Sequence, residues 1–260
     1  MKRVEIRALG GFHILAGGAD VTCPPTHAER LVRLLVRTGG TADLSSVTGV
    51  MWPGTPARTA RRRLRNVLAR LRERYGGIVR RQGDLLVLDA PVDVFRLAAA
   101  AEAVAGGGLG PGATELRACA GLWRGDLFAG DDASSLEGAR ERTRQQYLMV
   151  LDRLADLAAA EGRVLDEVYW LDRAYRTAPH DERRIVRIVA RLAATGHEGR
   201  AREAFALGCD VSTELGVRIP PALAAAAAVL ATAYRRVPAA VGVAAVGVAG
   251  VGVAAVGVAA

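Results

Sequence analysis

Apolar residues occupy every second position over residues 4–8, and they do so again over residues 12–14. A Gly-Gly pair separates the two runs and permits a tight turn between them. Strict alternation is typical of a strand that buries one face and exposes the other. The pattern predicts a short antiparallel hairpin, followed by a second candidate strand that holds Val21 and Cys23.

The spacing of apolar residues then changes to three and four positions, which predicts two helices. Thr26 and Glu29 form a capping box at the start of the first helix, and the Gly-Gly pair at 39–40 ends it. The second helix begins near Asp43, keeps its apolar residues on one face, and stops at Pro53.

A third helix is predicted in the stretch 57–77, and it carries an apolar stripe. Thr55 is placed to cap this helix, Pro56 suits its first turn, and Gly76 is placed to end it. Its stripe recurs at steps of three and four and consists of Ala60, Leu64, Leu68, Leu71 and Tyr75. The stripe predicts that this helix docks on the other two.

Two extended runs follow Gly77 and are joined around Gln82, Gly83 and Asp84, which predicts a β-hairpin. Arg80 and Arg81 lie near its tip. Three helices followed by a hairpin with a basic edge form the pattern of a winged helix-turn-helix. We therefore expect an α+β winged-helix domain over residues 1–90.

The net charge of +8 is concentrated in the third helix and this hairpin. Residues 58–81 contain ten arginines and one acid, a net charge of +9, which leaves −1 for the rest of the chain. A localised basic patch is typical of a protein with a polyanionic partner, either nucleic acid or an anionic membrane surface. Arginines in the first turns also oppose the helix macrodipole, and an arriving phosphate would relieve that repulsion. We expect double-stranded DNA as the partner.

The candidate DNA-binding residues fall into two groups. Five on the third helix are the base- and phosphate-facing candidates: Arg58, Arg61, Arg62, Arg65 and Asn66. Four others are placed for the flanking DNA backbone: Arg63, Arg70, Arg80 and Arg81.

The second half of the chain, residues 91–236, lacks strand signals and predicts an all-α domain. Its segments include a helix over about residues 114–130 and a long helix opened by a capping box at Ser134 and Glu137. "AAEGRV" at 159–164 and "AATGHE" at 193–198 lie 34 residues apart, which is the period of tetratricopeptide helix pairs. The composition changes near residue 90, so we expect each half to have its own core.

The order of these segments resembles a known family. "HAERLVRLLVRTGG", "LSSVTGVMWPG", "ARTARRRLRNVLARLRERYGG" and "GDLLVLD" resemble the OmpR-type winged helix of the Streptomyces antibiotic regulatory protein family. The chain departs from the family at Asp84 and Leu85, where an aromatic residue and its partner usually stand. "LWRGDLF", "EGARERTRQQYLMVLDRLADLAAAEGR" and "STELGVRIPPAL" resemble the bacterial transcriptional activator domain that follows it. The resemblance covers about residues 3–235.

The resemblance implies a cytoplasmic transcriptional activator that binds direct repeats near promoters, with a homodimer on the repeats as one arrangement. It also implies RNA polymerase as a partner and secondary-metabolite genes, including those for antibiotics, as targets. A different class stays open, in which the chain is a protein-interaction adaptor whose winged helix does not read DNA.

No pattern in the chain indicates catalysis, a metal or a cofactor. Cys23, Cys119 and Cys209 lie far apart without a CxxC pair. His180 and Asp181 lie at a turn between helices, where capping or surface roles are expected. A nucleophile motif such as GxSxG is absent from the sequence, and "GGGLGPG" at 106–112 lacks the Lys-Ser or Lys-Thr of a phosphate loop.

Residues 237–260 form a tail of different composition. From residue 241 it consists of four pentads of Val, Gly and Ala without a polar side chain. Its length would suit a membrane crossing, with Arg235 and Arg236 on the cytoplasmic side. The regular glycines are more typical of an elastin-like disordered chain, so we expect a flexible tail rather than an anchor. A membrane-anchored regulator remains the alternative.

Overall fold

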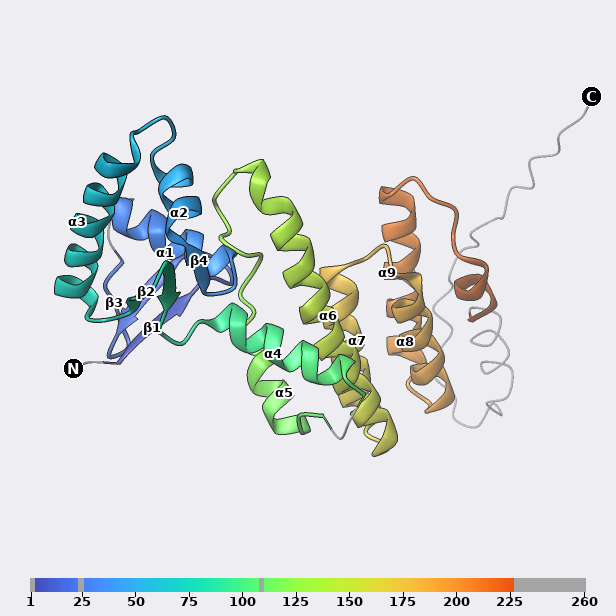
Figure 1. The fold of residues 1–260 in the computed structure, drawn as a ribbon. Coiled ribbons are helices and arrows are strands. Elements are labelled where there is room, and N and C mark those ends of the chain that lie inside the picture. The colour runs from blue at the N-terminus through green and yellow to red at the C-terminus, as the bar shows by residue number, and fades with distance from the viewer. Residues whose placement is uncertain (1–2, 23–25, 108–109, 227–260) are drawn as a thin grey trace, which may run out of the picture.

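The computed structural model describes residues 3–22, 26–107 and 110–226. Within these ranges an N-terminal half of small sheets and three helices is followed by a row of helices that leads away from it (Figure 1). Predictions for Cys23 and for the tail, residues 237–260, lie outside the described residues.

The first sheet confirms the predicted hairpin. Strands β1 (Val4–Arg7), β2 (His13–Ala16) and β3 (Ala19–Asp20) form an antiparallel sheet in that order. Ile6 pairs with Ile14, and both side chains are buried, as the alternation predicts. The second candidate strand, expected to hold Val21, is wrong at that residue, because β3 consists of Ala19 and Asp20 and ends before it. The Val21 backbone N–H still donates to the Ile14 carbonyl at 2.9 Å.

Helices α1 (His27–Arg37), α2 (Leu44–Met51) and α3 (Ala57–Tyr75) occur where the sequence predicts them. Thr26 caps α1 by accepting from the Glu29 N–H at 3.3 Å, but the Glu29 carboxylate accepts from Arg33 at 2.8 Å instead of completing the box. Asp43 caps α2 by accepting from the Ser46 N–H at 2.8 Å. The hydrogen bond from the Ser45 hydroxyl, followed by the bonds from Ser46, lowers the pKa of Asp43.

The C-terminal end of α3 agrees with the prediction, whereas the cap at its N-terminal end does not. Gly76 ends the helix with a φ of 74°, as expected. At the start, the capping position is Pro56 and no side chain caps the helix, so the expectation that Thr55 is the cap is wrong. The Thr55 hydroxyl instead accepts from Arg63 at 3.5 Å.

The buried face of α3 is also rotated slightly from the predicted stripe. Its buried residues are Ala60, Leu64, Val67, Leu71 and Tyr75. Leu68 is only partly buried, so Val67 occupies the buried position that was predicted for Leu68. Both residues continue the spacing from Leu64, three and four positions on, and spacing alone does not choose between them.

A second sheet contains the predicted hairpin and one strand that the sequence did not indicate. β5 (Val79–Gln82) and β6 (Leu85–Leu88) are joined through Gly83, whose φ of 60° suits a tight turn. β4 (Thr41–Asp43) pairs with β6 on its other side, with Ala42 opposite Leu86. Three residues are too few to display an alternation. The hairpin is therefore anchored to the segment between α1 and α2.

In the second half, the regular structure of the described residues is helical. Its elements are α4 (Asp93–Ala105), α5 (Ala113–Ala120), the short 3₁₀ turn η1 (Ser134–Leu136), α6 (Glu137–Ala160), α7 (Val164–Thr177), α8 (Glu182–Ala194) and α9 (Glu198–Glu214). Helices α6 to α9 pack consecutively side by side (Figure 1). Gly162 and Gly196, which lie 34 residues apart, take φ values of 70° and 77° in the turns after α6 and α8. The two turns are structurally equivalent, as the repeat indicates.

Two local predictions in this half are wrong. The helix expected over about residues 114–130 ends at Ala120, and residues 121–133 form irregular structure. The expected capping box at Ser134 and Glu137 is not formed, because α6 begins after a 3₁₀ turn and has no side-chain cap.

The apolar core continues across the boundary between the halves. One cluster contains Ile6, Leu9 and Phe12 from the N-terminal half together with Leu127 and Phe128 from the helical half. The expectation of two separate cores is therefore not met. The contacts responsible come from the irregular segment after α5, for which the sequence pattern indicates no packing.

Candidate nucleic-acid interface

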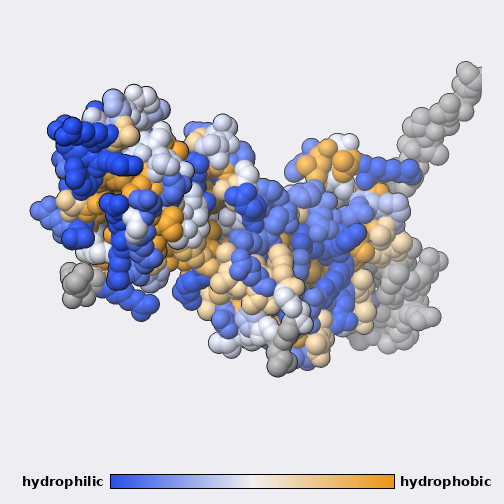
Figure 2. Space-filling view, viewed as in Figure 1, coloured by the Kyte–Doolittle hydropathy of each residue, from blue (hydrophilic) through white to orange (hydrophobic). Residues whose placement is uncertain are grey.

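The solvent-facing side of α3 carries arginines without partners. Five of its predicted site residues are exposed and make no ion pair or hydrogen bond with the described part of the chain: Arg58, Arg61, Arg62, Arg65 and Arg70. Asn66 is exposed on the same side. Figure 2 shows strongly hydrophilic residues gathered over α3. By contrast, Arg184 and Arg187 of the helical half each pair with two carboxylates.

The start of α3 concentrates positive charge. Its first turn has no acidic residue, its backbone N–H groups lack a side-chain cap, and Arg58 lies within that turn. Uncapped N–H groups and the positive end of the helix dipole both favour an anion, and the arginine adds to this potential. A phosphate group would therefore bind more favourably at this end than at a helix start that a side chain already caps.

A hollow of about 350 Å³ lies between α3 and the β5–β6 hairpin. Its arginines come from both elements, and its lining is Leu44, Arg58, Arg61, Leu64, Arg65, Leu68, Arg81 and Asp84. The Arg81 guanidinium donates to the Gly83 carbonyl at 2.7 Å and lies 3.5 Å from the Asp84 carboxylate. Arg81 is thereby held against the hairpin tip, on the side that faces α3.

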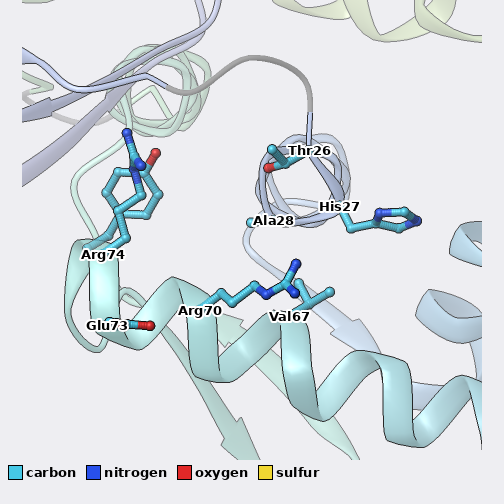
Figure 3. Close-up of a pocket in the computed structure, with 8 residues that line it drawn as sticks. Thr26, His27, Ala28, Val67, Arg70, Glu73 and Arg74 are labelled. Carbon is cyan, nitrogen blue, oxygen red and sulfur yellow. The ribbon is translucent and has the colours of Figure 1, made fainter.

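A second hollow lies on the opposite flank of α3, toward α1. One part, of about 450 Å³, is lined by His27, Trp52, Arg63, Asn66, Val67 and Arg70. The adjoining part, of about 460 Å³, shares three of these residues and reaches Arg74 and Tyr75. Figure 3 shows Arg70 extending from α3 toward α1, where His27 lies. The rings of His27 and Trp52 stack with centroids 5.6 Å apart.

The arrangement places α3 as a ridge between two arginine-lined hollows. Arg62 lies on the side of α3 opposite Leu64 and Leu71, which are buried, while Arg65 and Arg70 lie toward the two flanks. A helix with side chains is about 10–12 Å across, and the major groove of B-DNA is about 12 Å wide. A helix in that groove has a phosphate backbone on each side, which matches positive charge on both flanks.

The structure separates two residues that the sequence placed together. Neighbouring residues on a strand point to opposite faces, so Arg81 faces α3 whereas Arg80 does not line either hollow. Arg80 instead forms an ion pair with Asp89. His27, Trp52 and Arg74 also belong to this surface, although the sequence did not single them out. The first two come from separate helix ends, and only the fold brings them together.

Other chemistry finds little support in the described residues. In that part of the chain, no three His, Cys, Asp or Glu side chains gather as a metal site would require. Asp181 caps α8 by accepting from the Arg183 N–H at 3.2 Å, as the capping interpretation predicts. Burial raises the pKa of the Cys119 and Cys209 thiols, which disfavours the reactive thiolate. Over 3–22, 26–107 and 110–226, we find no helix whose length and apolar character suit a membrane crossing.

Three comparisons place the chain among known proteins. The family model described as the bacterial transcriptional activator domain matches residues 91–230. The chain is similar to Regulatory protein AfsR of Streptomyces coelicolor (strain ATCC BAA-471 / A3(2) / M145), with 30% identity over 220 residues. That match covers 80% of this chain and 22% of AfsR, so the chain spans about a fifth of the length of this relative.

The fold is similar to a solved structure of Mycobacterium tuberculosis EmbR in complex with a low-affinity phosphopeptide. The TM-score is 0.62 at 18% identity, and the match covers 92% of this chain and 66% of EmbR. At this identity the likeness concerns the fold alone. It is consistent with a winged helix and its small sheets followed by a helical domain.

Proposed function

Because this chain belongs to the bacterial transcriptional activator domain family, and within it to the Streptomyces antibiotic regulatory proteins, we propose that it is a sequence-specific DNA-binding transcriptional activator. The observation that carries this proposal is the unpaired arginine face of α3, with an arginine-lined hollow on each flank. Positive charge on three adjoining surfaces matches a helix inserted between two phosphate backbones.

We assign roles from position. Arg62, Arg65 and Asn66 reach base edges, because Arg62 lies on the outer side of α3 and Arg65 and Asn66 lie on either side of it, at the rims of the two hollows. The remaining candidates contact phosphates, on the hairpin side through Arg58, Arg61 and Arg81 and on the α1 side through Arg63 and Arg70. Arg80 contributes least, since Asp89 already neutralises it.

The division of labour follows the chain. Residues 1–90 act as an OmpR-type winged helix that binds duplex DNA, and residues 91–236 act as a tetratricopeptide-like domain that docks a partner. By family resemblance the DNA sites are direct repeats near promoters, occupied by two copies of the chain, and the partner is RNA polymerase. Genes of secondary metabolism are the proposed targets, and the cytoplasm is the proposed location. The role is regulatory and not enzymatic.

A salt titration of duplex binding tests the proposal. A specific site is first found by footprinting upstream of neighbouring genes. Arg62→Ala and Arg65→Ala should each lower the affinity for this site more than the affinity for random DNA. The expected difference is about 1–3 kcal/mol for a lost bidentate contact to guanine. Arg81→Ala should lower the affinity for all duplexes alike. It should also reduce the slope of log affinity against log salt concentration by about one.

The matched control is Arg142→Ala, since Arg142 is exposed on α6 and has no partner among the described residues. This variant should leave both affinity and slope unchanged. If the folded wild-type chain shows no salt-dependent binding to any duplex, the proposal is wrong and the adaptor interpretation replaces it.

A further inference from the structure

The irregular segment between α5 and η1, residues 121–133, lies across the N-terminal half, and we call it the strap. The Gly10 N–H donates to the Asp126 carbonyl at 3.0 Å, and the Phe128 N–H donates to the Ala8 carbonyl at 2.8 Å. Leu127 forms bridges with Leu9 and Gly11. A segment from the helical half therefore pairs with residues 8–11, the connection between β1 and β2, through backbone hydrogen bonds.

Asp93, in the first turn of α4, ties the strap to the same hairpin. Its side chain is only 1% exposed. The carboxylate accepts from the backbone N–H groups of Ala8 at 2.8 Å and Leu9 at 3.2 Å, and from the Arg124 guanidinium at 2.6 Å. Desolvation raises the pKa of Asp93 against these bonds. The residues directly after β1, helix α4 and the strap thus meet at one buried carboxyl group.

Arg33 makes the corresponding connection from α1. Its guanidinium carbon lies 4.6 Å from the ring centroid of Phe12 and 5.2 Å from that of Phe128. The same group pairs with Glu29 at 2.8 Å and with Asp131 of the strap at 3.2 Å. Because cations are attracted to aromatic faces as well as to carboxylates, the contacts of Arg33 with Phe128 and Asp131 hold α1 and the strap together.

The strap has a backbone conformation at Phe128 that is unfavourable for a non-glycine residue. Phe128 has a φ of 52°, which a bulky residue adopts only when its surroundings impose it. Arg140 of α6 donates to the carbonyls of both Leu127 and Phe128 at 3.1 Å. A Cβ on Gly10, whose φ is +83°, would lie 2.6 Å from the Arg124 backbone. The two backbones approach so closely that the strap has little room to shift.

Helix α1 also packs directly on α3, so the contacts form a continuous route from the strap to the arginine face. We propose that the strap locks α1, and with it α3, in a fixed orientation relative to the helical half, and that Arg33 is a positioning residue for DNA binding. This inference rests on the proposed function. Arg33 lines neither hollow beside α3, so its effect is transmitted through packing.

The experiment compares two strap variants with a control, all in the full chain. Arg33→Gln removes the pairing with two carboxylates, and Gly10→Ala displaces the strap without changing any charge. The control is Arg187→Gln, because Arg187 also bridges two carboxylates, Glu167 and Asp156, but far from the strap. Each protein is assayed for hydrogen exchange and for affinity to the specific duplex across salt concentrations.

Both strap variants should exchange faster in β1, α1 and α3 and should bind the specific duplex about tenfold more weakly at an unchanged salt slope. The control should change neither property. Wild-type affinity in either folded strap variant, or a loss accompanied by a lower slope, would overturn the inference, since a lower slope means that Arg33 itself contacts phosphate.

If one strap variant fails to fold, the other decides the outcome. If the wild-type chain binds no duplex, the proposed function fails and the exchange measurement alone decides whether α3 is locked. Faster exchange of α3 in a strap variant, and not in the control, supports the lock. Unchanged exchange of α3 refutes it.

Discussion

Tyr147 on α6 carries a buried polar atom that the structure leaves unsatisfied. Its ring stacks on Trp123 with centroids 4.3 Å apart, and its buried hydroxyl makes no hydrogen bond of standard geometry with the described groups. The Arg173 guanidinium lies near the ring, 5.5 Å from its centroid, and opposes the rise in the pKa of Tyr147 without forming a well-aligned bond to the hydroxyl. A buried hydroxyl without a partner costs free energy. Tyr147→Phe should therefore raise the free energy of unfolding by about 1 kcal/mol, as measured by denaturant titration at neutral pH.

The same residue should make stability depend on alkaline pH. Burial raises the pKa of Tyr147 from 10.0 to about 12, so the folded chain holds this proton more tightly than the unfolded chain. Its contribution is fully present below pH 10 and declines as the pH rises from 10 to about 12. Tyr147→Phe should flatten that decline. An equally steep decline in the variant would contradict the assignment.

Leu68 and Leu71 on α3 differ in burial in a way that the sequence did not distinguish. Leu71 is 1% exposed, whereas Leu68 is partly buried and lines the hollow beside the hairpin. Leu71→Ala should cost about 2–5 kcal/mol of stability, and Leu68→Ala clearly less. Thermal unfolding of the two variants tests this order, and equal losses would restore the stripe that the sequence predicted.

At the start of α3, helix stability and the proposed binding of a phosphate make opposite demands on the capping residue. No side chain caps α3, and its capping position is occupied by Pro56. Pro56→Ser should be more stable than Pro56→Ala by about 1 kcal/mol, because serine adds a cap and the alanine comparison removes the effect of losing proline. Denaturant unfolding of both variants gives the difference.

An acidic cap separates the two properties. Pro56→Asp should stabilise α3 at least as well as Pro56→Ser, yet weaken duplex binding, because it places a negative charge where we propose a phosphate. Pro56→Ser should bind DNA as Pro56→Ala does. If Pro56→Asp binds duplexes as tightly as Pro56→Ser, the start of α3 lies away from the DNA backbone.

Elements with strong local signals were predicted well, and those that depend on distant partners were not. Periodicity and the stop at Gly76 located α3, and the two-residue turn at Gly83 located the hairpin. The strand β4 was missed because it has only three residues and exists through pairing with β6. The Ser134 box was wrong because a 3₁₀ turn replaces the expected helix start.

The residues of the candidate site also fall into those that a local pattern indicates and those that only the fold brings together. Arginine spacing along one helix was sufficient to indicate the exposed face of α3, because a helix converts sequence spacing directly into direction. The stack of His27 on Trp52 joins the start of α1 to the end of α2, and no local pattern reports it. Arg80 and Arg81 were grouped by charge, but the strand directs them to different sides.

At the scale of the whole molecule, the two halves share one apolar core. Leu9 and Phe12 of the N-terminal half are buried together with Leu127 and Phe128 of the strap. The rings of Phe12 and Phe128 meet edge to face with centroids 5.8 Å apart. A chain with one continuous core is expected to unfold as one cooperative unit, even though its sequence suggests two modules.

We therefore predict that the full chain unfolds in a single transition and that residues 1–92 alone are less stable. Trp52 reports on the N-terminal half, and Trp123 and Trp170 report on the helical half, so variants that keep one tryptophan each follow one side. Their denaturation curves should coincide. The fragment loses α4, with Asp93, and the strap that covers Leu9 and Phe12, which should cost at least about 3 kcal/mol, as large losses of core packing do. Two separate transitions in the full chain, with the first at the midpoint of the fragment, would mean that the halves are independent and that the strap contributes little to holding them together.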